Sequence, residues 1–198
     1  MKSVGFKEWA IVCQALGEGQ QTVILRKGGI AEGRDGFAFR HREFFLFPTF
    51  FHEQIEKTRL TDGRVPKPNE LQIEIRFFAR IEHVCRIQSW GTVAALESFH
   101  VLKQSVVQER FDDVRASGIH AAFVRIFRLD PGWILPNEKR YAGCRSWIQL
   151  PDPPAKIRLK PVLGETQNAE IEQKFLGTIE LNSQPQPENP PLAFPCDS

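Results

Sequence analysis

The feature that most constrains the fold is a stretch of twelve residues, 71–82, in which apolar side chains alternate with mostly polar ones. Successive side chains of a β-strand point to opposite faces, so this pattern predicts one long strand with a buried face and a largely solvated face. A solvated face is typical of antiparallel sheets, because helices cover both sides of the strands in doubly wound parallel sheets. The chain is therefore expected to build a sheet that is mainly antiparallel.

Shorter patterns predict the partners of this strand. Further strands are expected at 9–16, 22–27, 44–47, 121–129 and 145–150, and helices at 49–54, 90–99, 102–114 and from Asn168 onward. The segment 9–16 could also form a short helix, because periodicity does not separate the two structures in a short apolar run. Together these elements predict an α+β fold: a mixed, mainly antiparallel sheet, curved or barrel-like, with three or four packed helices.

The length of 198 residues and the 41% share of hydrophobic residues suit one globular domain with an appendage. We expect a single α+β domain over residues 1–150. A C-terminal extension over 151–182 is expected to carry a docking helix, since Ile171 and Phe175 would share one helical face. Residues 183–198 hold five prolines and little that could pack, so this tail is expected to be disordered.

Charge and cysteine content argue against several classes of protein. The net charge of +2 is close to neutral, so any contact with nucleic acid must come from a local basic patch. The four cysteines form no C-x-x-C pair, which argues against a closed zinc site, and no metal or cofactor is expected. With neither a signal peptide nor an apolar run of membrane-spanning length, we expect a cytoplasmic protein that does not contact membranes. The sequence does not predict its oligomeric state.

The first candidate binding site is a basic pair followed by two glycines, at residues 26–29. Glycine lets the backbone approach an anion closely, and Arg26 and Lys27 beside Gly28 would add positive charge, so the segment could hold a phosphate. It matches neither a Walker loop nor the G-x-G-x-x-G dinucleotide motif. The simpler interpretation is a strand that ends in a glycine turn beside two solvated cations.

Two histidines that flank a phenylalanine-rich segment form the second candidate. His41 and His52 could serve in acid–base chemistry near neutral pH, or bind a metal together with Glu43 or Glu53 as a third ligand. Histidines in such a position more commonly form the polar edge of an aromatic core. The phenylalanines between them are too apolar to leave in water and are expected in the core rather than as a base-stacking surface.

A third candidate is an arrangement of acidic residues like that of a nuclease. Restriction-type nucleases use an aspartate, then a glutamate and a lysine two positions apart on a strand, and Asp62, Glu74 and Arg76 follow this order. Arginine stands where lysine is needed, and a guanidinium does not deprotonate to activate a water. The wet face of an amphipathic strand explains these side chains more simply.

Arginines are also frequent in the second half of the chain. Arg110 falls on an otherwise apolar helical stripe, and Arg125 lies in the predicted strand 121–129. Guanidinium groups bind phosphate oxygens in a bidentate manner, so a patch shared with Arg26 and Lys27 would form a nucleic-acid or nucleotide surface. Solvated strand faces are the alternative.

Several motifs, in this order along the chain, resemble those of a known family. The segments K-E-W-A-I-V-C-Q-A-L, Q-T-V-I-L-R-K-G-G-I and F-F-L-F-P-T-F-F-H-E-Q, followed by G-C-R-S-W-I-Q-L at 143–150, are similar to the uncharacterised family named domain of unknown function 1802. The resemblance covers residues from Phe6 to Leu150. It implies a role in restriction–modification or DNA-related defence, and it assigns no catalytic residues.

Three functional hypotheses follow from these observations. The favoured one is a recognition module that binds nucleic acid or another phosphate-bearing ligand through Arg26, Lys27, Gly28, His41, His52, Arg110 and Arg125. The second is a metal-dependent nuclease or phosphohydrolase that uses the two histidines and a carboxylate. The third is a scaffold that binds partner proteins, with the proline-rich tail as a tether. The first two require residues distant in sequence to converge.

Overall fold

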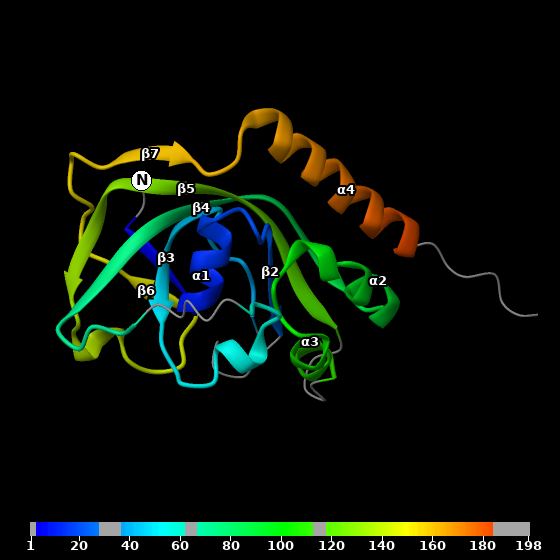
Figure 1. Ribbon diagram of the computed structural model, residues 1–198, viewed down its shortest axis with the longest axis horizontal. Coiled ribbons are helices and arrows are strands. Elements are labelled where there is room, and N and C mark those ends of the chain that lie inside the picture. The colour runs from blue at the N-terminus through cyan, green and yellow to red at the C-terminus, as the bar shows by residue number, and fades with distance from the viewer. Residues whose placement is uncertain (1–2, 28–36, 62–66, 113–117, 184–198) are drawn as a thin grey trace, which may run out of the picture.

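The computed structural model describes residues 3–27, 37–61, 67–112 and 118–183 (Figure 1). The strands of these residues are β1 (Val4–Trp9), β2 (Val23–Lys27), β3 (Glu43–Thr49), β4 (Gln72–Ile87), β5 (Ile119–Pro136), β6 (Trp147–Gln149) and β7 (Arg158–Pro161). The α-helices are α1 (Ala10–Gly17), α2 (Trp90–Ala95), α3 (Gln104–Phe111) and α4 (Glu165–Ser183). Short 3-10 turns are η2 (Ile55–Lys57), η3 (Glu97–Phe99) and η4 (Lys139–Tyr141).

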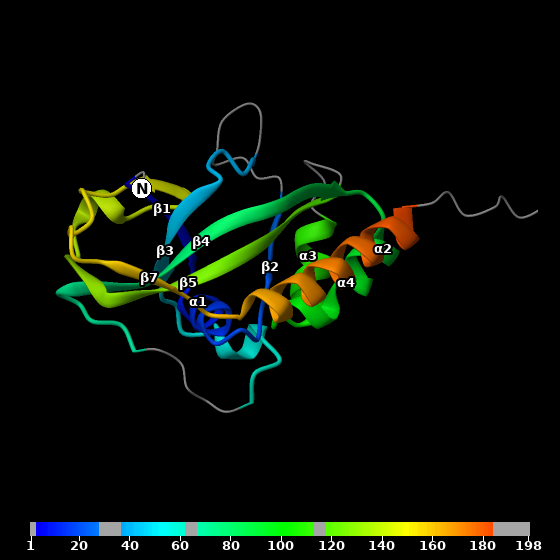
Figure 2. The ribbon, with the colours of Figure 1, turned by 90° about the horizontal axis from the view of Figure 1, so that it is seen from above.

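The seven strands form one sheet in the order β2-β5-β4-β3-β1-β6, and β7 pairs with a later part of β5. β1 and β3 run parallel, and the other strand pairs of the described residues are antiparallel. The predicted α+β class, with a mixed and mainly antiparallel sheet, is confirmed. The sheet curves (Figure 2), but its edge strands β2 and β6 do not pair in the described part of the chain. The prediction of a barrel-like form therefore goes too far.

The long strands β4 and β5 form the centre of the sheet and run along the length of the molecule in Figure 1. The alternation at 71–82 has the predicted consequence: Ile73, Ile75 and Phe77 are buried, while Gln72 and Glu74 are exposed. The helices α2, α3 and the C-terminal part of α4 gather at one end of this β4–β5 ribbon. α1 lies near the middle of the molecule in both views.

The phenylalanine-rich segment fills two hydrophobic clusters. Phe44 belongs to the larger cluster together with Phe6 and Phe123, whereas its neighbour Phe45 belongs to the smaller cluster together with Phe78. Successive residues of a strand point to opposite faces, so a run of phenylalanines in β3 can supply both faces of the sheet. Phe44, Phe45 and Phe47 are at most 3% exposed and lie in the core as predicted, whereas Phe50, at 37% exposed, does not.

Two short segments differ from the prediction. The pattern at 9–16 favours a strand, but β1 ends at Trp9 and α1 follows at Ala10. Every residue of this helix except Gln14 is buried, so it lacks the polar face from which a helical period is recognised. The expected helix at 49–54 is a turn that leads into η2. The Thr49 hydroxyl donates to the backbone oxygen of Glu8 at 3.0 Å instead of capping a helix.

Two boundaries also differ. β5 continues past Pro131 and Gly132, which lie in a register shift between β5 and β4. Proline has no backbone N–H to donate, and at this irregularity the pairing with β4 does not require one. α4 begins at Glu165, three residues before the predicted cap. The backbone N–H of Asn168 donates to the oxygen of Gly164 at 2.9 Å, which places Asn168 within the first turn of the helix.

α4 packs on the sheet through an aromatic residue, a histidine–carboxylate contact and an ion pair. Phe175 is 1% exposed and stacks on Phe123 of β5, with ring centroids 5.4 Å apart. Glu172 Oε1 lies 2.5 Å from His83 Nε2 of β4, and Glu165 pairs with Arg125 of β5. The helix therefore contributes a side chain to the larger hydrophobic cluster, although the predicted domain boundary at residue 150 stays a prediction.

Residues 184–198, which make up nearly all of the predicted tail, lie outside the described residues. Among the helices that are described, none combines the length and the apolar character needed to cross a membrane.

Candidate functional site

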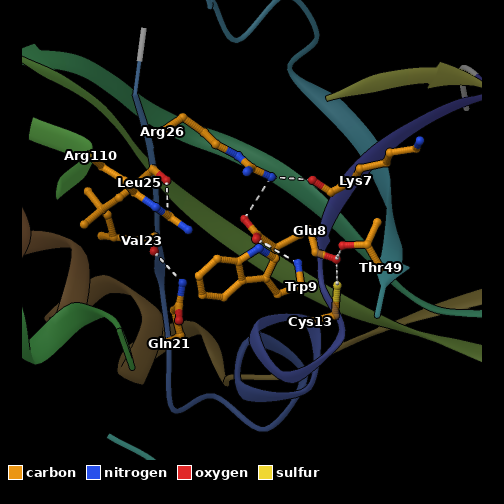
Figure 3. A network of polar contacts seen from close by, with 10 residues as sticks. All are labelled: Lys7, Glu8, Trp9, Cys13, Gln21, Val23, Leu25, Arg26, Thr49 and Arg110. Atoms are coloured by element: carbon orange, nitrogen blue, oxygen red, sulfur yellow. Dashed lines mark hydrogen bonds and ion pairs between the residues drawn. The ribbon is translucent and has the colours of Figure 1, made fainter. Parts of the chain in front are cut away.

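A buried carboxylate links two strands that do not pair with each other. Glu8 of β1 is 2% exposed, and its Oε2 lies 3.1 Å from Nη2 of Arg26 in β2. The same Nη2 donates to the backbone oxygen of Lys7 (Figure 3). β1 pairs with β3 and β6, and β2 pairs with β5, so these contacts span the open side of the curved sheet. Arg26 is therefore held against β1 by an ion pair and a backbone contact.

The surroundings of Glu8 fix its position. Its Oε1 accepts from the backbone N–H of Trp9 at 2.8 Å, and its backbone oxygen accepts from Thr49 Oγ1 and, at 3.8 Å, from Cys13 Sγ. Burial, and then the negative charge of Glu8, raise the pKa of the Cys13 thiol. The charge of Arg26 acts in the opposite direction but is outweighed, so Cys13 is a neutral donor at physiological pH and not a thiolate nucleophile.

Arg110 of α3 is the second cation at this place. Its Nη1 donates to the backbone oxygen of Leu25 at 2.8 Å, and its guanidinium carbon lies 4.8 Å from the centroid of the Trp9 ring. The pKa of Arg110 is lowered to about 10, chiefly by burial; the charges of Glu8 and Glu109 oppose this shift, and that of Arg26 adds to it. Arg110 stays charged at neutral pH, yet it forms no ion pair with a carboxylate among the described residues.

We name Glu8, Arg26 and Arg110 the arginine cluster. Glu8 pairs with Arg26 and acts on Arg110 only through its charge, and Arg26 Nε is buried without a hydrogen-bond partner among the described residues. Arg26 also lies over the Phe6 ring, 4.6 Å from its centroid, so both guanidinium groups are oriented by aromatic faces. The cluster therefore presents oriented donors and an excess of positive charge, which is the chemistry that an anion requires.

Sequence reasoning named Arg26 and Arg110 and missed the carboxylate between them. Glu8 is the single acidic residue in the mostly apolar run from Phe6 to Leu16 and follows Lys7. A charged side chain that is buried in the core needs a partner of opposite charge. That signal could have identified Glu8, and it would have pointed to the arginines that are now found beside it.

Of the remaining predicted residues in the first half of the chain, those that the structure describes do not join the arginine cluster. Lys27 is exposed at the end of β2, and Gly28 lies outside the described residues. His41 packs edge-on against Trp147, with ring centroids 4.9 Å apart. His52 is exposed in the turn after β3.

The two histidines cannot share a ligand. His41 precedes β3 and His52 follows it, and a strand of seven residues separates them by roughly 20 Å. Metal ligands must lie within about 2–3 Å of a common ion. Within the described ranges, no three His, Cys, Asp or Glu side chains form a group that could hold a metal ion.

Arg125 lies on the other face of the sheet. Arg26 pairs in register with His120, and His120 and Arg125 occupy positions of opposite parity in β5. Residues of opposite parity point to opposite faces, so Arg125 faces α4, where it pairs with Glu165. The side-chain hydrogen bond to Glu165 is the main cause that raises the pKa of Arg125. Its role in the described structure is to hold α4.

A buried histidine that sequence reasoning left without a role lies beside α2. His100 is 3% exposed, and its Nδ1 has no partner among the described residues. Burial, with the nearby positive charges of Arg59 and Arg110, lowers the pKa of His100 to about 4. The imidazole is therefore neutral in the folded protein at physiological pH.

Acid is expected to destabilise the protein through His100. The unfolded side chain titrates near pH 6.5 and the folded one near pH 4, so between these values the unfolded state binds more protons and stability falls as pH falls. The expected loss between pH 7.5 and pH 4.5 is about 2–3 kcal/mol. Urea unfolding of the wild type and of His100→Gln at both pH values isolates this contribution. An equal pH dependence of the two proteins would contradict the assignment.

Comparisons with known proteins place the chain in a family. It is similar to crystal structures of ASCH from Zymomonas mobilis and of two mutant forms of that protein, at 12% identity and TM-scores of 0.41, 0.39 and 0.38. The aligned regions cover 87% of this chain and 94–98% of those chains. No curated protein matches the chain. Residues 5–174 match the family described as Domain of unknown function (DUF1802), and the chain therefore belongs to the DUF1802 family.

Proposed function

We propose that this domain is a recognition module that binds the phosphate groups of nucleic acid at the arginine cluster. The observation that carries the proposal is that Arg26 and Arg110 are both partly buried and oriented, and that Glu8 is the one carboxylate that acts on both of them among the described residues. A partly buried guanidinium without its own counter-charge is costly, because burial disfavours the charged form. A phosphate oxygen would supply that counter-charge through bidentate hydrogen bonds.

The residues beside the cluster support an extended ligand rather than a single phosphate ion. Arg26, His120 and Arg86 occupy one row across β2, β5 and β4, so their side chains share a face of the sheet. Burial, followed by the charge of Arg86, lowers the pKa of His120, which leaves the two arginines as the charges of this row. Cations spaced along a row match a chain of phosphates, as in single-stranded nucleic acid.

Replacing Arg110 tests the proposal. Arg110→Gln removes one phosphate contact and leaves the Glu8–Arg26 pair in place, so we expect weaker binding of labelled single-stranded RNA or DNA and a salt slope reduced by about one. Arg110→Lys keeps the charge and is expected to retain most of the affinity. Fluorescence anisotropy at two salt concentrations measures both quantities.

The matched control is Arg140→Gln. Arg140 is exposed and pairs with Glu138 near η4, outside the arginine cluster, so its loss should leave affinity and salt slope unchanged. Circular dichroism confirms that each variant is folded. If the wild-type protein binds no oligonucleotide at low salt, or if Arg140→Gln weakens binding as much as Arg110→Gln does, the proposal is wrong.

The other two hypotheses have less support in the described residues. The nuclease hypothesis depends on His41 and His52, which lie at opposite ends of β3. The scaffold hypothesis depends on the tail, nearly all of which lies outside the described residues. The link to restriction–modification that the family resemblance implies stays a prediction, and it would be one setting for a nucleic-acid recognition module.

A further inference from the structure

A pocket lies between α1, β3 and the first half of β4. It has a volume of about 250 Å³. Its residues include Ala10 and Cys13 of α1, Leu46 of β3 and Phe77 of β4, all of them buried apolar side chains. This pocket uses neither Arg26 nor Arg110, so it is independent of the function proposed above.

The rim of the pocket is apolar on two sides. Phe50, just after β3, is 37% exposed, and Ile134 of β5 is 59% exposed. Large apolar side chains left in water around a hollow with an apolar floor are characteristic of ligand sites. The floor and these two side chains together would enclose an apolar body.

Two cations complete the rim. Lys67 and Arg76 line the pocket, and neither forms an ion pair with a residue in the described ranges. The Arg76 guanidinium lies 5.6 Å from the centroid of the Phe77 ring, which orients it beside the apolar floor. Glu74 also lines the pocket, and its carboxylate lies close to the backbone of β5. A Cβ added to Gly132 would be only 2.9 Å from the Glu74 carboxylate oxygen. The charged rim therefore holds two positive groups and one negative group.

We infer that this pocket binds a small organic acid, a carboxylate attached to one aromatic ring or to a short branched apolar group. The carboxylate would bind Arg76 and Lys67, and the apolar body would lie on Leu46, Phe77 and Phe50. The volume is below the range of about 300–1,000 Å³ that drug-sized ligands occupy, so the body is limited to about one ring. An inorganic anion would leave the apolar surfaces in water, and a neutral ring would leave both cations without a partner.

Isothermal titration with benzoate, benzamide and acetate tests the inference. Benzoate should bind saturably, and benzamide, which lacks the charge, should bind about tenfold more weakly or worse. Acetate, which lacks the ring, should show a similar loss. Equal affinity for benzamide would reduce the site to an apolar hollow, and equal affinity for acetate would reduce it to surface charge, so either result overturns the inference.

Three exposed positions make the test specific to the pocket. Arg76→Ala should weaken benzoate binding about tenfold or more. Glu74→Gln removes the opposing charge and should strengthen binding about two- to fivefold. Leu71→Ala is the matched control, because Leu71 is 80% exposed just before β4 and lies outside the pocket lining. The Arg110→Gln protein should bind benzoate like the wild type, which separates this site from the arginine cluster. No change in Arg76→Ala, or weaker binding in Glu74→Gln, would contradict the inference.

Discussion

Glu8→Ala is expected to lower the free energy of unfolding by about 3–5 kcal/mol, because removal of one partner of a buried ion pair leaves an uncompensated charge. In this protein the loss leaves two guanidinium groups, those of Arg26 and Arg110, with no carboxylate between them. It also removes one of the two contacts by which Arg26 links β2 to β1, and only the backbone contact to Lys7 is left. Urea unfolding measures the change. Inorganic phosphate should restore part of the lost stability if it binds the folded variant in place of the carboxylate.

Glu43→Ala is the matched control for this prediction. Glu43 of β3 also pairs with an arginine, Arg80 of β4, at 2.9 Å, but both side chains are about 40% exposed. Ion pairs that face solvent contribute about 0–1 kcal/mol, so this variant should unfold close to the wild-type midpoint. A loss below 1 kcal/mol in Glu8→Ala, or equal losses in both variants, would show that the buried pair does not hold the two strands together.

Phe175→Ala is expected to cost about 3–5 kcal/mol, the range for truncation of a buried phenylalanine. Phe175 contacts Phe123 of β5 and, edge-on at 5.8 Å, Phe99 of η3, so its loss opens a cavity between α4 and the sheet. Urea unfolding gives the free energy. Limited proteolysis should show earlier cleavage within α4, because a weakly docked helix opens locally more often.

The control for Phe175 lies on the same helix. Leu181 is 78% exposed, and Leu181→Ala should change the free energy of unfolding by less than about 0.5 kcal/mol. The comparison also bears on the predicted domain boundary at residue 150. A large effect of Phe175 would mean that α4 belongs to the cooperative core, whereas a loss below 1 kcal/mol would contradict the packing described here and favour an independent extension.

The parts of the fold that the sequence predicts are those with a strong local signal. The alternation at 71–82 predicts β4, because one face of that strand is wet along its first half. α1 could not be predicted in this way, since burial of nearly every residue removes the contrast between faces. The continuation of β5 through Pro131 also depends on tertiary structure, because only the partner strand creates the register shift that accommodates it.

The candidate site was predictable only in part, for a related reason. Arg26 and Arg110 are recognisable as cations beside apolar residues, but their meeting point depends on the curvature that brings β2 close to β1. The sequence gives no reason to separate Arg125 from Arg26 and Arg110. In the structure, Arg125 is an odd number of residues from His120, the partner of Arg26 in β5, and therefore points to the opposite face of the sheet. The sequence therefore identifies candidate arginines, but the pairing and curvature of the strands determine which of them lie close together.

The central claim is that the arginine cluster binds phosphate groups, and NMR of the arginine Nε–H signals tests it most directly. On titration with a short single-stranded RNA, the signals of Arg26 and Arg110 and the indole N–H of Trp9 should shift together and saturate, while the signal of Arg140 stays in place. If the signals of Arg26 and Arg110 do not move while oligonucleotide binds, or if no signal moves at low salt, the cluster is a structural link between strands and not a ligand site.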